Sequence, residues 1–171
     1  FINLITFEEN RGKGCAIKAG LLKAKYDSII VFDSDLEISP DQIKKLMILN
    51  KKEKSSFVLG YRFTHLNPVK SGFDWGNFIF TTFFNILHGS NHKDTLCCAK
   101  SFYKSDINTS MLSSIGFDID VELTFILTLK NKNPRQVLMH YQRRDENEGK
   151  KLKISNGWEI LFRIVKMIKY F

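Results

Sequence analysis

The first 35 residues restrict the fold more than any other part of the chain. Residues 1–7 form a short apolar run with β-branched side chains, which predicts a strand. A polar turn with two glycines over residues 8–14 precedes a helical pattern over residues 15–25. Residues 28–32 are a continuous apolar run, typical of a strand covered on both faces, and they lead into the acidic sequence Asp33-Ser34-Asp35. This order predicts a βαβ unit with parallel strands and a right-handed crossover, and therefore an α/β fold.

The rest of the chain continues this alternation without an internal repeat or a low-complexity linker. We expect further helices over residues 42–50, 75–88, 103–111, 117–130 and 154–171, and further strands over residues 56–60, 96–102 and 135–141. The sheet is expected to be mostly parallel. Residues 1–153 would form one domain, and residues 154–171 a basic amphipathic helix that packs on this domain or lies on a membrane.

Composition and charge exclude several classes of protein. A chain of 171 residues with 43% apolar and 13% aromatic residues can bury a core, which argues against disorder. Residues 78–87, the longest apolar-rich run, are shorter than the roughly 20 residues that a membrane-spanning helix needs. Three cysteines form neither a disulfide framework nor a zinc pattern, which favours reduced thiols in the cytosol. The net charge of +8 suggests an anionic partner, such as phosphate-bearing substrates, an acidic membrane face or nucleic acid.

The acidic pair Asp33 and Asp35 is the first candidate site. Ligands of α/β proteins bind beyond the carboxyl ends of the strands, where these residues are expected to lie. Two carboxylates at this spacing can converge on Mg²⁺ or Mn²⁺, which prefer oxygen ligands and share them with substrate phosphates. The alternative is a helix cap or a solvated turn before Pro40.

Two further segments could bind phosphate at the same edge of the sheet. Residues 10–14, with Asn10, Gly12 and Lys13, combine glycines and positive charge before a helix, although a plain strand-to-helix turn explains them equally well. Arg62 follows the strand over residues 56–60 and would point toward the two aspartates. Its alternative interpretation is an ordinary exposed arginine.

Three more carboxylates are candidate bases or substrate ligands: Asp94, Asp120 and Glu122. Capping of a helix is the simpler role for Asp118 and Asp120. Glu122 lies between apolar neighbours inside a helix, so it needs a partner if it is buried. The four histidines have no metal-binding spacing, and we assign them no role.

Basic residues cluster near the C-terminus, with Arg143 and Lys151 in a charged loop ahead of the last helix. That helix alternates apolar residues with Arg163 and Lys166. Either it lies on a membrane surface, or it docks on the domain with a solvated basic face.

Taken in order, these motifs resemble the family 2 glycosyltransferases, and most of all the polyprenyl-phosphate branch that includes dolichyl-phosphate β-glucosyltransferase and dolichol-phosphate mannose synthase. The matching stretches are residues 10–20, Phe32-Asp33-Ser34-Asp35-Leu36-Glu37, Gly60-Tyr61-Arg62, residues 94–102, 117–123 and 148–152. The sequence departs from the family at Cys98-Ala99, where a glycine is usual, and at Lys150, where a serine is usual. The family begins with two further βα units, so we expect the N-terminal part of the domain to be missing from this sequence.

The resemblance implies a GT-A fold, a Rossmann-like α/β/α sandwich, with a nucleotide-diphosphate sugar donor and Mg²⁺ or Mn²⁺. By similarity, Asp33 would contact the nucleotide or metal, and Asp35 would ligate the metal. Asn10, Gly12 and Lys13 would bind the donor.

The resemblance also implies roles on the acceptor side. Arg62, Arg143 and Lys151 would bind acceptor phosphate or donor diphosphate. Asp94 and Glu122, with Asp120 as a further candidate base, would line the sugar or acceptor side.

The expected reaction is inverting sugar transfer to a polyprenyl phosphate on the cytosolic membrane face. An ionised phosphate needs no strong base, whereas a saccharide hydroxyl acceptor would need one of the three carboxylates. The alternatives to this enzyme are an inactive, basic membrane-binding fragment and a different sugar-nucleotide transferase on a related sheet. A nucleic-acid-binding module is the least supported, because no reading motif is present.

Overall fold

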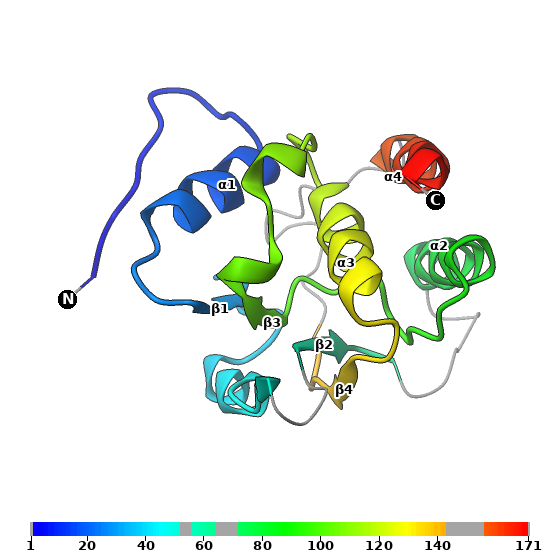
Figure 1. Ribbon diagram of the computed structural model, residues 1–171, viewed down its shortest axis with the longest axis horizontal. Helices are drawn as coiled ribbons and strands as arrows, with labels where there is room; N and C mark the ends of the chain where they lie inside the picture. Colours follow the sequence, from blue (N-terminus) through cyan, green and yellow to red (C-terminus); the bar gives the residue numbers. More distant parts are fainter. Residues whose placement is uncertain (1, 52–55, 64–71, 143–155, 171) are drawn as a thin grey trace.

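Four short strands form one mixed sheet in the computed structural model, which describes residues 2–51, 56–63, 72–142 and 156–170. The strands are β1 (Ser28–Val31), β2 (Phe57–Tyr61), β3 (Lys100–Tyr103) and β4 (Arg135–Leu138), and their order in the sheet is β1-β3-β2-β4. β3 is antiparallel to both neighbours, whereas β2 and β4 are parallel. β1, β2 and β4 therefore run in one direction and β3 runs against them, which confirms the expected α/β class (Figure 1).

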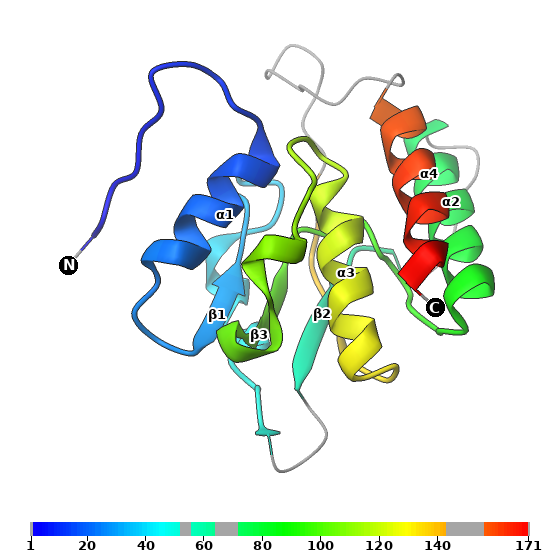
Figure 2. The same ribbon diagram turned by 45° about the horizontal axis from the view of Figure 1, so that its top comes forward.

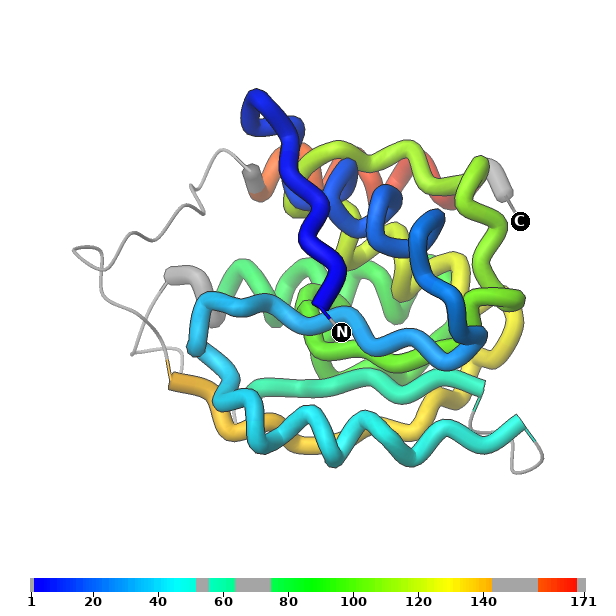
Figure 3. The backbone as a smooth tube through the Cα atoms, turned by 90° about the vertical axis from the view of Figure 1, so that its left-hand side faces the viewer, coloured from blue at the N-terminus to red at the C-terminus, as the bar shows by residue number. Residues whose placement is uncertain are grey.

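Helices cover one face of this sheet, and a 3₁₀ helix covers the other (Figures 1 and 3). On the first face lie α1 (Lys13–Lys23), α2 (Gly72–His88), α3 (Ile119–Lys130) and α4 (Asn156–Lys166), and α4 continues into the 3₁₀ turn η6 (Met167–Tyr170). On the second face lies η1 (Pro40–Leu46). The result is the layered sandwich that the resemblance implied.

Alternation along β2 divides the core into two parts. Phe57 and Leu59 are buried among residues of the helices, whereas Val58 is buried with Leu46 of η1 and Met139. Successive side chains of a strand point to opposite faces, so a strand that is buried throughout must contact a hydrophobic layer on each side.

α4 has apolar residues on both of its sides. Ile160, Ile164 and, one turn further, Met167 are buried in the same core as α2 and α3, so this helix is docked on the domain. The exposed side of α4 also carries large apolar residues and is not the solvated basic face that the sequence suggested. The helix lies beside α2 (Figure 2). We call the exposed apolar residues of these helices the outer apolar face: Trp75, Phe78, Ile79 and Ile86 of α2, Trp158, Phe162 and Val165 of α4, and Ile168 of η6. None of the helices in the described parts of the chain combines the length and the apolarity that spanning a bilayer requires.

Three sequence-based expectations were wrong in detail. Residues 2–7 form no strand, pair with none of the described strands and leave Ile2 and Leu4 exposed, so the parallel βαβ unit predicted for the first 35 residues does not form. Residues 42–50 were expected to be α-helical, but the helical part is the 3₁₀ helix η1. The helix expected over residues 103–111 is replaced by two 3₁₀ turns, where Asn108 and Asp27 side chains accept hydrogen bonds from the backbone N–H groups of Ser110 and Ser105. Such local bonds compete with a helix.

His92 gives the core a dependence on pH. Its ring is buried near Phe57 and Phe84, and its Nε2 lies 2.8 Å from the hydroxyl of Thr128. Burial, together with the nearby charge of Lys100 and His88, lowers the pKa of His92 to about 4. As pH falls, His92 therefore binds a proton in the unfolded chain at a higher pH than it does in the folded chain. The free energy of unfolding is unaffected by the titration of this histidine above pH ~6.5 and decreases as the pH falls from there to ~4.

We expect the replacement His92→Gln, which does not titrate, to remove about 3 kcal/mol of the acid-induced loss of unfolding free energy between pH 7 and 4. Urea unfolding at a series of pH values measures this. His140→Gln, at an exposed side chain, is the control and should leave the pH profile unchanged. Parallel profiles for the wild type and His92→Gln would contradict the assignment.

Candidate active site

The ends of three strands bring the candidate residues to one edge of the sheet. Val31, the last residue of β1, and Leu59 of β2 both pair with Lys100, the first residue of β3. Because β3 is reversed, its beginning lies beside the carboxyl ends of β1 and β2. The loop after β1, Arg62 after β2 and the segment before β3 therefore meet where α/β proteins bind ligands.

Lys13 joins two carboxylates at this edge. Its Nζ lies 2.7 Å from Oδ2 of Asp33 and 2.8 Å from Oδ2 of Asp120, 107 residues further along the chain. The side chain of Asp33 remains 35% exposed, while that of Asp120 is 7% exposed. Burial by itself would lower the pKa of Lys13, but the two carboxylates outweigh burial and raise it, so the ammonium stays charged.

Asp35 is held in a tight turn. Its Oδ1 accepts a hydrogen bond from the backbone N–H of Glu37 at 3.1 Å, and Leu36 between them has a φ of 66°. A left-handed leucine costs of order 1–3 kcal/mol, and such strain gathers at ligand sites. The N-cap of η1 is Ser39, so neither Asp33 nor Asp35 caps that helix. The capping alternative for this pair is therefore wrong.

The two glycines of the predicted phosphate loop pack against protein backbone. A Cβ atom on Gly12 or Gly14 would lie 2.2 Å from the carbonyl oxygen of Ile115 or Ser114, respectively. Gly14 also donates to the carbonyl of Ile115, and Asn10 accepts from the N–H of Gly12 at 3.0 Å. Gly12 and Gly14 therefore let the start of α1 pack closely against the loop before α3. This close packing supports the interpretation of the segment as a structural turn.

Arg62 and Asp94 form a buried, two-pronged ion pair. Nε of Arg62 lies 2.8 Å from Oδ2 of Asp94, and Nη2 lies 3.0 Å from Oδ1. Asp94 has no exposed side-chain surface, and the guanidinium lies over the rings of Phe63 and Tyr141. Burial would lower the pKa of Arg62, but Asp94 raises it. The alternative of an exposed arginine is therefore wrong, and each of these residues already has a charged partner.

Glu122 has the partner that its burial required. It accepts hydrogen bonds from the backbone N–H groups of Ser113 and Ser114 and lies 3.0 Å from Nη1 of Arg163 on α4. The same guanidinium lies 2.8 Å from Asp118. Asp118 stands at the N-cap of α3 but makes no side-chain capping bond, and Asp120 binds Lys13 instead. The capping role expected for both was wrong, because each carboxylate forms an ion pair instead, Asp118 with Arg163 and Asp120 with Lys13.

The structure thus separates the candidates into three groups. Asp33, Lys13 and Asp120 lie together, Arg62 pairs with Asp94, and Glu122 lies against α4. Asp35 is in the same loop as Asp33. Asn10 and Gly12 lie in the turn before α1, while Arg143 and Lys151 lie outside the described residues, as does the match at residues 148–152.

All three candidate bases are engaged in ion pairs. Asp94 is bound by Arg62, Asp120 by Lys13, and Glu122 by Arg163. Burial would raise the pKa of Asp120, but the charges of Lys13 and Lys100 outweigh it and lower this pKa. A carboxylate with a lowered pKa is a weak proton acceptor, which disfavours Asp120 as a general base.

The donor set at the loop after β1 fits a hard cation. Asp33 and Asp35 supply carboxylate oxygens, and the described residues contain no cluster of three or more His, Cys, Asp or Glu residues able to enclose a metal. Mg²⁺ and related ions commonly use one or two carboxylates and complete their coordination with substrate phosphates and water. The residues present therefore suit a metal that binds together with a diphosphate.

Sequence reasoning missed two residues of this site, Lys100 and Arg163. Lys100 lies inside an otherwise apolar strand segment, and a lysine at a strand position that must be buried was an available signal. Arg163 looked like part of a solvated basic face, and nothing local in the sequence identified its partners on α3.

Comparisons with known proteins bear on the fold and on the family of the chain. Crystal structures of glucosyl-3-phosphoglycerate synthase from Mycobacterium tuberculosis are similar to this chain. The complex with phosphoglyceric acid has a TM-score of 0.67 at 14% identity, covering 92% of this chain and 55% of that chain. The complex with Mn²⁺, UDP-glucose and glycerol 3-phosphate has a TM-score of 0.63 at 12% identity, with the same coverage. The chain thus spans about half the length of these structures.

At this identity the likeness concerns the fold, which is that of a GT-A glycosyltransferase. No curated protein matches the sequence. The family model described as "Glycosyl transferase family 2" matches residues 1–108, which include Lys13, the Asp33–Asp35 loop, Arg62 and Asp94. The aspartate pair at the end of β1, the fold and this match agree, and the chain belongs to glycosyl transferase family 2.

Proposed function

We propose that this chain transfers a sugar from a nucleotide-diphosphate donor to a polyprenyl phosphate at the cytosolic face of a membrane, with inversion at the anomeric carbon. The observation that carries the transferase proposal is the pair Asp33 and Asp35 in a strained loop at the carboxyl end of β1, within a chain of this family. The Mycobacterium tuberculosis structures with Mn²⁺ and UDP-glucose support a donor of this class.

The donor diphosphate would bind at this edge of the sheet beside two carboxylates, Asp33 and Asp35, and the ammonium of Lys13. Asp33 and Asp35 would hold Mg²⁺ or Mn²⁺, which supplies positive charge to the leaving diphosphate. Oδ2 of Asp33 is already bound by Lys13, so this carboxylate offers its other oxygen to the metal or the nucleotide. Lys13 sets the orientation of Asp33 through a 2.7 Å contact. In this scheme positioning and electrostatics provide the catalysis.

Engagement of the three candidate bases favours a phosphate acceptor over a hydroxyl. A phosphate monoester has its second pKa near 6, so its oxygen is ionised at neutral pH and needs no base. That oxygen forms a bond to the anomeric carbon while the bond from this carbon to the diphosphate breaks, and the nucleoside diphosphate leaves. A saccharide hydroxyl would have to lose a proton to Asp94, Asp120 or Glu122, each of which is in an ion pair.

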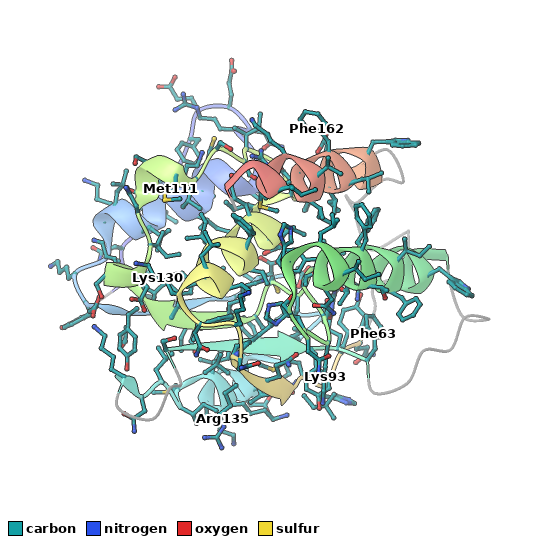
Figure 4. All side chains as sticks on the ribbon, turned by 45° about the vertical axis from the view of Figure 1, so that its right-hand side comes forward. Phe63, Lys93, Met111, Lys130, Arg135 and Phe162 are labelled. Atoms are coloured by element: carbon teal, nitrogen blue, oxygen red, sulfur yellow. The ribbon has the colours of Figure 1, made fainter. Side chains whose placement is uncertain are left out.

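The outer apolar face supports a lipid-bound acceptor. A Cβ on Gly157 would lie 3.3 Å from the ring of Phe80, so the start of α4, with Trp158, adjoins the middle of α2. Phe162 points away from the sheet on the outer side of α4 (Figure 4). Tryptophan and phenylalanine on one side of a helix suit the boundary between lipid head groups and acyl chains, and the net charge of +8 suits anionic lipid.

We expect Phe162→Glu to weaken binding to vesicles of phosphatidylserine and phosphatidylcholine by at least about tenfold, because a large apolar side chain no longer enters the bilayer. Co-sedimentation with vesicles measures this. The matched control is Leu22→Glu, at an exposed leucine of α1, which should bind as the wild type does. Equal loss in both variants would show that the added negative charge alone is responsible, and no loss in either would remove the face from the proposal.

A second candidate acceptor is a small phosphate-bearing molecule with a hydroxyl group, which the likeness to glucosyl-3-phosphoglycerate synthase favours. Transfer of radiolabelled sugar from UDP-glucose or GDP-mannose, with Mn²⁺, to polyprenyl phosphate in vesicles or to 3-phosphoglycerate separates the two. Label in the lipid fraction supports the proposal, and label in phosphoglycerate alone supports the second candidate. Neither labelled product, together with no Mn²⁺-dependent rise in melting temperature with either donor, would overturn the transferase proposal.

A further inference from the structure

Lys100 is a buried cation that the chemistry above leaves without a role. It is the first residue of β3, and its side chain has no exposed surface. Lysine is almost never fully buried unless it is paired, because burying an ammonium without compensating partners is costly. Its ammonium donates to the carbonyl of Cys97 and lies 3.8 Å from Oδ1 of Asp120.

Asp120 connects this cation to Lys13. Its Oδ2 lies 2.8 Å from Lys13, while its buried Oδ1 accepts no hydrogen bond from the described residues. The ammonium of Lys100 is therefore the charge that faces Oδ1. The two lysines approach different oxygens of one carboxylate, so the position of Asp120 depends on both.

Four alternating charges thus run from the core to the loop after β1: Lys100, Asp120, Lys13 and Asp33. The contacts along this series are 3.8, 2.8 and 2.7 Å. Exposure increases in the same direction, from a fully buried lysine to an aspartate whose side chain is 35% exposed. Coulombic interactions are strong where water is excluded, so a change at the buried end should reach the exposed end.

We propose that Lys100 is a positioning residue for the metal and diphosphate site. Lys100 and Lys13 both interact with the carboxylate of Asp120, so the charge of Lys100 determines how strongly Lys13 interacts with Asp33. This inference rests on the proposed function of Asp33 as a metal-site carboxylate. With Lys100 present, Lys13 is divided between two carboxylates. Without Lys100, Lys13 is the one cation that remains in an ion pair with Asp120 among the described residues, while Arg62 acts only as a more distant charge, so Asp120 draws Lys13 away from Asp33.

Two variants at the buried end of the series give opposite predictions for metal binding. Lys100→Met removes a positive charge and weakens the hold of Lys13 on Asp33, so Mn²⁺ should bind about threefold or more tightly. Lys100→Met combined with Asp120→Leu removes one charge of each sign and leaves Lys13 wholly to Asp33, so Mn²⁺ should bind about threefold or more weakly. A residue that merely supported the fold would not shift the affinity in opposite directions.

Titration of the full chain with Mn²⁺ alone, followed by the electron paramagnetic resonance signal of free Mn²⁺, measures both affinities. Lys104→Met is the control and should leave the affinity unchanged, because this half-buried lysine just after β3 donates to the carbonyl of Ala24 at 2.8 Å and belongs to none of these ion pairs. If Lys100→Met does not fold, the doubly substituted chain still tests the proposal, because its buried pair is replaced by apolar groups.

The outcomes are distinct. Wild-type affinity in both Lys100 variants, or a shift in the same direction in both, would overturn this inference while the metal site stands. Absence of Mn²⁺ binding in the wild type, both alone and in the presence of UDP, would instead overturn the metal-site role of Asp33 and Asp35, and the inference with it.

Discussion

Asp35→Asn is expected to reduce sugar transfer by at least about 100-fold, the scale of loss seen when one electrostatic contact to a developing charge is removed. The substitution keeps the size of the side chain and a carbonyl oxygen able to accept from the N–H of Glu37. It removes the negative charge that would hold the metal against the diphosphate. The expected change is therefore in turnover and Mn²⁺ dependence, with little change in melting temperature. Transfer of radiolabelled sugar over a range of Mn²⁺ concentrations measures it.

Asp27→Asn is the matched control for that experiment. Asp27 precedes β1, whereas Asp35 follows it, so the two aspartates flank opposite ends of the same strand. Asp27 is half exposed and pairs with Lys51 at 2.7 Å. An exposed pair of this kind contributes little to stability, and it lies away from the site. Equal activity in wild type and Asp35→Asn would remove Asp35 from the mechanism.

Arg62→Met is expected to lower the unfolding free energy by about 3–5 kcal/mol, because it leaves the buried carboxylate of Asp94 without its counter-charge. Both side-chain oxygens of Asp94 accept from the guanidinium, at 2.8 and 3.0 Å, and Asp94 has no exposed surface. Replacing both partners, Arg62→Met with Asp94→Leu, should recover most of this loss. Urea unfolding of the single and double variants measures the difference.

The exposed pair of Lys51 and Asp27 provides the comparison, with side chains 54% and 45% exposed. Lys51→Met should lower the unfolding free energy far less than Arg62→Met does, since water screens the charge that is left on Asp27. The same series also tests the role first expected for Arg62. If Arg62 binds diphosphate or acceptor phosphate, its loss will reduce transfer while the unfolding free energy stays near the wild-type value. Such a result would contradict the role of Arg62 as the structural counter-charge of Asp94.

Local patterns in the sequence predicted the elements that their own neighbours determine. The run over residues 28–32 predicted β1 and placed Asp33 and Asp35 at its end, because a strand that packs against hydrophobic layers on both faces is apolar throughout, although this edge strand is only partly buried. The apolar neighbours of Glu122 along the helix predicted that this acid would need a partner if it were buried, and the structure shows it buried.

Other local patterns misled because a competing contact decided the outcome. Residues 2–7 have the composition of a strand, yet propensity supplies no neighbouring strand to pair with. At Gly12 and Gly14 the structure adds a packing role, because the backbone of Ser114 and Ile115 occupies the space that their missing Cβ atoms leave, while donor binding by Asn10, Gly12 and Lys13 stays a prediction.

The sequence by itself determined the α/β class, the family and the place of the aspartate pair, since these follow from periodicity and from motifs within short stretches. Only the tertiary structure decided which charges meet. Lys13 and Asp120 are 107 residues apart, Arg62 and Asp94 are 32 apart, and Glu122 and Arg163 are 41 apart. The physical reason is that a buried charge must be neutralised by whichever opposite charge the packing of helices and strands brings within about 3–4 Å, and that distance is independent of separation along the chain.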